Sequence, residues 1–162
     1  MDTVDHRLEL ARAADAPAIA AMSARLIEAG LAPSWPAERI YQHIHNEESV
    51  VLTARRPGAL TGFAIMQFGD STAHLNLLAV DSHSQRRGLG GALLTWLEAS
   101  ATVAGTFVIQ LELRASNAAA HAFYVKRGYR ECGRVPGYYQ RVEDAIQMTR
   151  DLSVPGSPAG SL

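Results

Sequence analysis

The chain has 162 residues but only one cysteine, almost no net charge and no long apolar run. Because Cys132 has no second thiol to pair with, an internal disulfide is excluded, which fits a reducing compartment. No apolar run reaches the roughly 20 residues that a membrane span needs, and residues 1–7 lack the pattern of a signal peptide. A formal charge of −1 argues against broad binding to nucleic acid or to anionic membranes. We therefore expect a cytoplasmic protein that binds neither.

The composition is that of an ordinary globular protein. Apolar residues make up 48% of the chain and charged residues 19%. The length suits one domain with a substantial core. From residue 153 onward Pro, Gly and Ser dominate, which predicts a tail with little structure of its own. We expect a single domain over residues 1–152 and a tail over residues 153–162.

Hydrophobic periodicity predicts alternating strands and helices along the chain. Strands are expected at residues 8–10, 49–55, 60–68, 74–80, 106–114, 129–135 and 145–150, and helices at 16–29, 37–48, 89–103 and 118–127. Asp15 is expected to cap the first helix, and Pro57-Gly58 and Pro136-Gly137 are expected to form turns. The order βααβββαβαββ indicates the α/β class, with a mixed, mostly antiparallel sheet and helices on both faces.

Three glycines mark the junction between the central strand and the helix that follows it. Gly88, Gly90 and Gly91 remove side chains there, so backbone N–H groups can approach a ligand. The start of the helix adds unpaired donors and a partial positive charge, with Arg86 and Arg87 beside them. The pattern favours a phosphate or pyrophosphate as the ligand.

Two common phosphate motifs do not fit this loop. A P-loop needs Gly-Lys-Ser/Thr, which is absent here, and the dinucleotide fingerprint needs a third glycine at a fixed distance. The remaining alternative is a plain helix start whose glycines only permit close packing.

The loop sequence resembles that of a known family. Residues 85–90, Gln-Arg-Arg-Gly-Leu-Gly, follow a strand ending in Ala-Val-Asp and resemble the Gln/Arg-x-x-Gly-x-Gly/Ala pyrophosphate loop of the GNAT N-acetyltransferases. Residues 111–129 are similar to the strand and helix that come next in this family. Residues 138–148 resemble the end of its ribosomal-protein alanine N-acetyltransferase branch. Together the resemblance covers residues 73–150.

The resemblance implies the GNAT fold and direct acetyl transfer from acetyl-CoA to a primary amine, without a metal. In the family the backbone of the glycine loop binds the pyrophosphate, while the end of the preceding strand and a later helix start bind the pantetheine arm. The implied cofactor-binding residues are Leu78, Ala79, Val80, Arg86, Arg87, Gly88, Leu89, Gly90, Gly91, Ala92, Asn117 and Tyr124.

Glu112 is the candidate general base. An α-ammonium group has a pKa near 7.7–8.0 and a lysine near 10.4, so the acceptor must lose a proton before it attacks. Glu112 lies between Leu111 and Leu113 in a predicted strand and points to the opposite face, where burial would raise its pKa. The alternative is a glutamate that faces solvent or pairs with Arg114. The family resemblance favours the base.

Tyr124 is the candidate acid. It follows Asn117 by two helical turns, so both side chains can face the cofactor sulfur. A phenol can protonate the departing thiolate or donate a hydrogen bond to it. The alternative is an aromatic core residue beside Phe123, and the resemblance again favours the catalytic role.

The histidines do not show the spacing of metal ligands. His43 and His45 are two residues apart on a predicted helix and diverge. For His74, His83 and His121 we expect surface or capping roles. No metal site is predicted.

The acceptor is the least determined feature of the sequence. Residues 138–148 favour the N-terminal α-amine of a protein or peptide. A small amine or amino acid is the second candidate, and a non-catalytic acetyl-CoA-binding module the third. On the central strand Leu77 stands where the alanine-acetylating branch tends to carry Asn, and Asn76 comes one residue earlier. A monomer and a homodimer are both compatible with the sequence.

Overall fold

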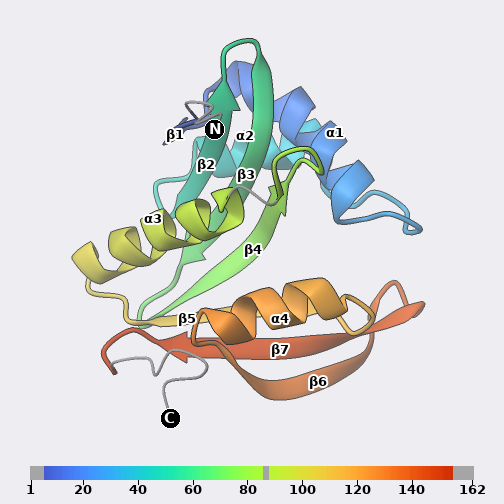
Figure 1. Cartoon of the computed structure of the whole chain (residues 1–162), viewed down its shortest axis with the longest axis vertical. Coiled ribbons are helices and arrows are strands. Elements are labelled where there is room, and N and C mark those ends of the chain that lie inside the picture. The colour runs from blue at the N-terminus through green and yellow to red at the C-terminus, as the bar shows by residue number, and fades with distance from the viewer. Residues whose placement is uncertain (1–5, 86–87, 155–162) are drawn as a thin grey trace. The chain divides into compact units, whose positions relative to one another are not determined.

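The computed structural model describes residues 6–85 and 88–154 of the chain (Figure 1). The strands are β1 (Arg7–Leu10), β2 (Ser49–Arg56), β3 (Ala59–Phe68), β4 (Thr72–Val80), β5 (Val108–Arg114), β6 (Arg130–Tyr139) and β7 (Glu143–Asp151). The helices are α1 (Ala16–Leu26), α2 (Ala37–Ile44), α3 (Leu89–Val103) and α4 (Ala118–Lys126), with a 3₁₀ turn η1 (Ala13–Asp15) before α1. The predicted order of elements is confirmed.

Hydrogen-bonded pairing links the strands in the order β1-β2-β3-β4-β5-β7-β6. The β4–β5 pair is parallel, whereas β1–β2, β2–β3, β5–β7 and β6–β7 are antiparallel. The mixed, mostly antiparallel sheet is therefore as predicted. The chain forms two compact units, of residues 1–67 with 76–99 and of residues 68–75 with 100–162. Within the predicted tail, residues 155–162 lie outside the described residues.

The core of the first unit lies between α1, α2 and one face of its strands. Ile19 of α1 and Ile40 of α2 are fully buried against Phe63 and Ile65, which share a face of β3 because strand side chains alternate. Gly62 faces the other way, and a Cβ atom there would lie 3.3 Å from Leu93 Cδ1 of α3. Helices thus cover both faces of these strands, as expected (Figure 1).

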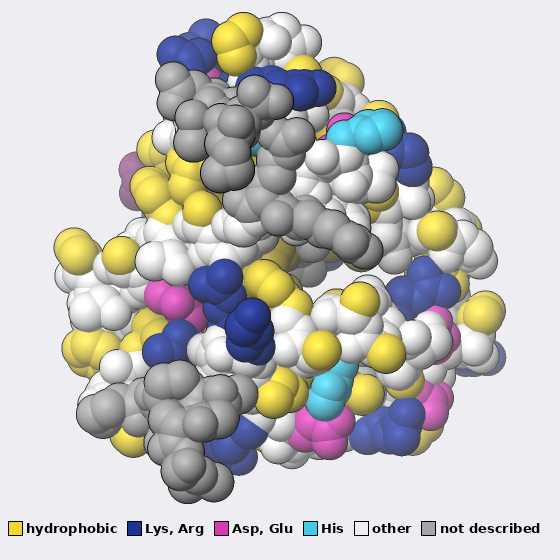
Figure 2. All heavy atoms as spheres, viewed as in Figure 1, with side chains coloured by type: hydrophobic (Ala, Val, Ile, Leu, Met, Phe, Trp, Pro, Cys, Tyr) yellow, Lys and Arg dark blue, Asp and Glu magenta, His cyan; other side chains and the backbone are white. Residues whose placement is uncertain are grey.

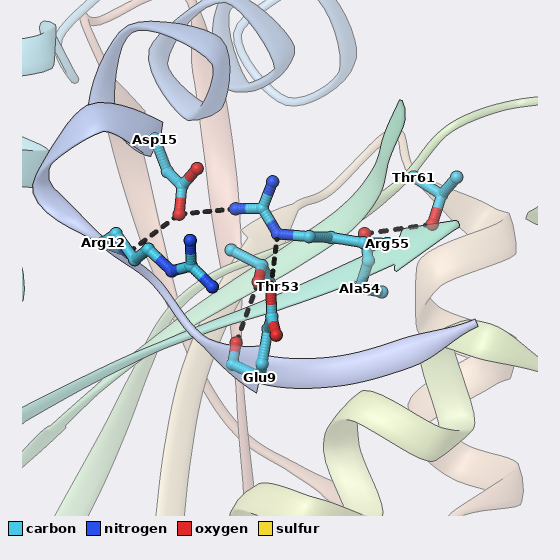
Figure 3. A network of polar contacts seen from close by, with 7 residues as sticks. All are labelled: Glu9, Arg12, Asp15, Thr53, Ala54, Arg55 and Thr61. Atoms are coloured by element: carbon cyan, nitrogen blue, oxygen red, sulfur yellow. Dashed lines mark hydrogen bonds and ion pairs between the residues drawn. The ribbon is translucent and has the colours of Figure 1, made fainter. Parts of the chain in front are cut away.

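Arg55 of β2 connects the first strand to the segment before α1 (Figure 3). Its Nε lies 3.0 Å from Oε1 of Glu9, and its guanidinium also contacts Asp15. The Asp15 carboxylate accepts a second bond, of 2.7 Å, from the backbone N–H of Arg12. Asp15 is the N-cap residue of α1, as predicted, but its side chain makes no capping hydrogen bond because the carboxylate contacts Arg12 and Arg55 instead.

Both N-terminal helices are shorter than predicted. After α1 the buried carboxylate of Glu28 accepts hydrogen bonds of 2.6 Å from the backbone N–H and the hydroxyl of Ser34, which folds the chain back at this point. After α2 the Asn46 side chain accepts a bond of 2.9 Å from the N–H of Glu48. Such local side-chain bonds compete with a continued helix.

The turn between β6 and β7 differs from the prediction. Pro136-Gly137 is not the turn, because β6 continues to Tyr139 with an irregular pairing between Val135 and Tyr139. The chain reverses at Gln140 and Arg141, with φ angles of 56° and 62°. Positive φ at both central residues suits the twist of a tight hairpin. The consequence is that the tyrosine pair of the hairpin lies on a strand.

The face drawn in Figure 2 carries basic, acidic and apolar side chains interspersed with one another. Among residues 6–85 and 88–154, no helix combines the length and the apolar character that a membrane span requires. The same residues contain no group of three or more His, Cys, Asp and Glu side chains placed to hold a metal.

Candidate active site

Glu112 lies at the centre of the second unit, on β5. Its neighbours Leu111 and Leu113 are buried on one face, and the strand alternation turns Glu112 to the other. Its side chain is 14% exposed. On one side β5 pairs with β4, and on the other Glu112 is the direct partner of Gln147 in β7. A carboxylate in the middle of a sheet needs hydrogen-bond donors from neighbouring strands.

Three side chains supply these donors. Nε2 of His74 lies 2.6 Å from Oε1 of Glu112, and the Tyr138 hydroxyl donates to the same oxygen over 3.4 Å. The Gln147 side chain adds a further hydrogen bond. The bond from His74 holds the pKa of Glu112 below its ordinary value, although burial acts in the opposite direction. Burial alone led us to expect a raised pKa, whereas Glu112 is ionised at neutral pH and able to accept a proton.

Arg114, the other partner considered for Glu112, is engaged elsewhere. Its Nε donates to Oε1 of Glu143 over 2.7 Å, and Glu143 also accepts a bond of 2.7 Å from the backbone N–H of Ser116. The hydrogen bonds from Ser116 and then from Arg114 lower the pKa of Glu143 to about 2. The hydrogen bond between Arg114 and Glu143 joins the end of β5 to the start of β7.

Tyr124 is buried in α4, with 7% of its surface exposed. Its ring packs edge-on against Phe123 and Tyr129, at centroid distances of 5.1 and 5.5 Å. Burial, and then the neighbouring Tyr139, raise the pKa of Tyr124 well above its ordinary value. The phenol is therefore protonated over the physiological range and can act as a hydrogen-bond donor.

Tyr139 links the two candidate catalytic residues electrostatically. Burial raises its pKa, and the charges of Tyr138 and Glu112 raise it further. Tyr139 also raises the pKa of Tyr124, so it interacts electrostatically with both Glu112 and Tyr124. Sequence reasoning singled out Glu112 and Tyr124, and the structure adds the β6 tyrosines as their neighbours.

His74 is the residue that sequence reasoning missed. We expected a surface or capping role, but the ring contacts Glu112 from the adjacent parallel strand. No local pattern signals this contact, because it depends on which strands pair and in which register. His121 does make a surface contact, with Glu131 over 2.8 Å.

The glycine loop starts α3 at Leu89, as predicted. Gly88 has a φ of 74°, and a Cβ atom at this position would meet no atom within 4 Å. The N–H of Ala92 donates to the carbonyl of Gly88 over 3.0 Å. Leu89, Gly90 and Gly91 form the N-terminal turn of α3, and helix N-termini attract anions. The predicted contacts of Arg86 and Arg87 lie outside the described residues.

The other implied cofactor contacts lie at two element ends. Leu78, Ala79 and Val80 form the end of β4, where the Gln85 side chain donates to the carbonyl of Val80 over 3.0 Å. Asn117 is the N-cap of α4 and accepts a bond of 3.0 Å from the N–H of Ala120. Its contact with a cofactor stays a prediction.

Comparison with known proteins identifies close relatives. Residues 20–150 match the GNAT acetyltransferase domain family. The chain is 36% identical over 121 residues to the ribosomal protein bS18 alanine N-acetyltransferase of Escherichia coli, covering 73% of this chain and 82% of the relative. The crystal structure of the Escherichia coli ribosomal-protein-S18-alanine N-acetyltransferase matches with a TM-score of 0.80 and 31% identity, covering 94% and 97% of the two chains. An N-acetyltransferase of Thermoplasma acidophilum, solved in complex with coenzyme A, shares the fold with a TM-score of 0.77 and 16% identity over 91% and 99%.

Proposed function

The chain belongs to the GNAT acetyltransferase family and is an N-acetyltransferase, and we propose that it acetylates the N-terminal α-amine of a protein with acetyl-CoA as donor. The observation that carries the proposal is the buried, ionised carboxylate of Glu112, which His74 and Tyr138 contact through hydrogen bonds. The buried phenol of Tyr124 stays neutral. Amine acetylation requires a base for the amine and a hydrogen-bond donor for the leaving sulfur, and Glu112 and Tyr124 can supply them.

Glu112 takes a proton from the acceptor ammonium, directly or through one water molecule. Acetyl-CoA supplies the thioester whose acetyl group moves to the nitrogen, the C–N bond forming as the C–S bond breaks. The nitrogen loses its second proton to solvent as the amide forms. An α-ammonium group suits this base better than a lysine does, because its pKa of about 7.7–8.0 is over two units lower.

Tyr124 stabilises the leaving sulfur by donating a hydrogen bond. A thiol has a pKa of about 8.5, below even the ordinary value for tyrosine. Because burial raises the pKa of Tyr124 further, complete proton transfer to the thiolate would be unfavourable. The phenol therefore keeps its proton, and the thiolate takes its own from solvent after it leaves.

The first turn of α3 fits the pyrophosphate of the donor. It is the N-terminus of a 15-residue helix, and a Cβ atom on Gly88 would meet no atom within 4 Å. In the proposal the backbone of Leu89, Gly90 and Gly91 contacts the pyrophosphate, and the end of β4 binds the pantetheine arm. The N–H of Ala92, a further predicted contact, donates to the carbonyl of Gly88.

The α-amine acceptor is supported by the bS18-acetylating relative and by the β6–β7 hairpin. Tyr138 is 49% exposed and donates to Glu112, so this hairpin borders the proposed base. A ribosomal acceptor would require a cytoplasmic enzyme. One observation favours the small-amine alternative: Leu77 is buried in the core at the position where the alanine-acetylating branch carries Asn.

An acceptor panel tests the proposal. Thiol release from acetyl-CoA is measured with peptides that begin with Ala, Ser or Met, with the same peptides blocked at the N-terminus, with an N-blocked lysine peptide and with small amines. The proposal predicts turnover with the free N-termini alone. Turnover with small amines only would contradict the proposed α-amine acceptor. Binding of acetyl-CoA without any turnover would contradict the proposed catalytic activity.

A further inference from the structure

The contact between His74 and Glu112 is short for a hydrogen bond, at 2.6 Å, and shorter than the 3.4 Å bond from Tyr138 to the same oxygen. The two residues come from adjacent parallel strands and are 38 positions apart in the sequence. The His74 side chain is 41% exposed and that of Glu112 14%. The imidazole therefore touches both the buried carboxylate and solvent.

We propose that His74 is a positioning residue for the base: its Nε2–H donates to Oε1 of Glu112, which fixes the carboxylate in one orientation and stabilises its ionised form. The proposal rests on the proposed function of Glu112.

Among the described residues, the other groups that act on Glu112 carry no positive charge. Tyr138 of β6 donates to it over a long 3.4 Å, and Gln147 of β7 adds a hydrogen bond from a neutral amide. Tyr139 of β6, a phenol with a raised pKa, interacts with it electrostatically. Within this described set, His74 of β4 contacts the carboxylate at 2.6 Å, closer than Tyr138 does. A hydrogen bond to an ionised acceptor is shorter and about twice as strong as one between neutral groups.

The orientation matters because the two donors converge on a single oxygen of the carboxylate. Both His74 and Tyr138 donate to Oε1. Because both hydrogen bonds end on one oxygen, the carboxylate cannot rotate about the Cγ–Cδ bond without breaking both of them. A base held in one geometry meets the acceptor with less loss of rotational freedom.

The test follows the titration of Glu112 itself. The side-chain carboxyl carbon of Glu112 is observed by ¹³C NMR in the full-length protein, and its signal is identified by its loss in Glu112→Gln. In His74→Leu the midpoint is expected to rise by about 1–2 pH units, because a hydrogen bond to a charged group contributes about 1.5–3 kcal/mol. In His74→Gln, which keeps an N–H donor but not the imidazole ring, an intermediate rise of the Glu112 titration midpoint is expected.

The same variants are assayed for acetyl transfer. We expect kcat/KM to fall about tenfold or more in His74→Leu, with partial recovery in His74→Gln and an unchanged KM for acetyl-CoA. His121→Leu is the matched control, because it removes the ring of the surface His–Glu pair that includes Glu131. This control should leave both the Glu112 midpoint and kcat/KM unchanged.

An unchanged Glu112 midpoint in His74→Leu would overturn the proposal, as would full activity despite a shifted midpoint. If His74→Leu does not fold, the Glu112 titration midpoint in His74→Gln serves instead: an intermediate rise would support the proposal, and no rise would overturn it. Failure of the proposed function can be told apart from failure of this proposal. The first would appear as absent turnover by the wild-type enzyme in the acceptor panel, and the Glu112 titration could still be measured by NMR.

Discussion

Arg114 donates a hydrogen bond of 2.7 Å to Glu143, although Glu112 lies two residues away on the same face of β5. Two oppositely charged residues so placed could pair with each other. Instead, the start of β7 engages the arginine, and His74 of β4 engages Glu112. The charge state of the proposed base is therefore set by strand pairing and not by its neighbours in sequence.

The Glu143 contacts predict a loss of stability in acid. The pKa of Glu143 is about 2 in the folded protein, against an ordinary value of 4.5. Since the folded state lowers this pKa, the stabilisation is complete above pH 4.5 and disappears as the pH falls toward 2. Urea unfolding of the wild type and of Glu143→Gln should differ by a constant amount above pH 4.5 and converge below it. A difference that does not change with pH would contradict this account.

Tyr124→Phe should lower kcat by about 10- to 100-fold, which corresponds to a lost hydrogen bond of about 1.5–3 kcal/mol to a developing charge. The affinity for acetyl-CoA should be unchanged, since the ring and its packing remain. Tyr129→Phe is the control, because it removes a hydroxyl from the ring that packs 5.5 Å from Tyr124. Steady-state kinetics and calorimetric titration with acetyl-CoA separate the two effects, and normal turnover by Tyr124→Phe would refute its role.

Gly88→Ala should weaken acetyl-CoA binding. Gly88 and Gly58 both have a positive φ, of 74° and 77°, and at each position an added Cβ atom would meet no other atom within 4 Å. The backbone strain of alanine, about 1–2 kcal/mol, should therefore be similar at both sites. Thermal unfolding should show equal destabilisation, whereas only Gly88→Ala should lose affinity for acetyl-CoA. Equal affinities in the two variants would argue against the loop as the pyrophosphate site.

Sequence patterns predicted the features that depend on local chemistry. The start of α3 at Leu89 follows from the glycine loop, and the start of α4 follows from the capping side chain of Asn117. Glu112 and Tyr124 could be chosen because strand alternation and helical spacing are local, and the family resemblance weighted that choice.

Features that depend on distant contacts could not be predicted. The partner of Glu112 required the register of β4 against β5. The turn at Gln140 and Arg141 carries none of the usual glycine or asparagine-glycine signals, whereas Pro136-Gly137 carries such a signal and lies within β6. In both cases tertiary pairing outweighed the local preference.

The most direct test of the account is the activity of Glu112→Gln toward a peptide with a free N-terminus. The variant keeps the size of the side chain but cannot accept the proton, so kcat/KM should fall about 10²- to 10⁴-fold while acetyl-CoA affinity is retained. Glu131→Gln, which alters the surface His–Glu pair in the same way, should retain full activity. Near-normal kcat/KM in Glu112→Gln would contradict the assignment of Glu112 as the base.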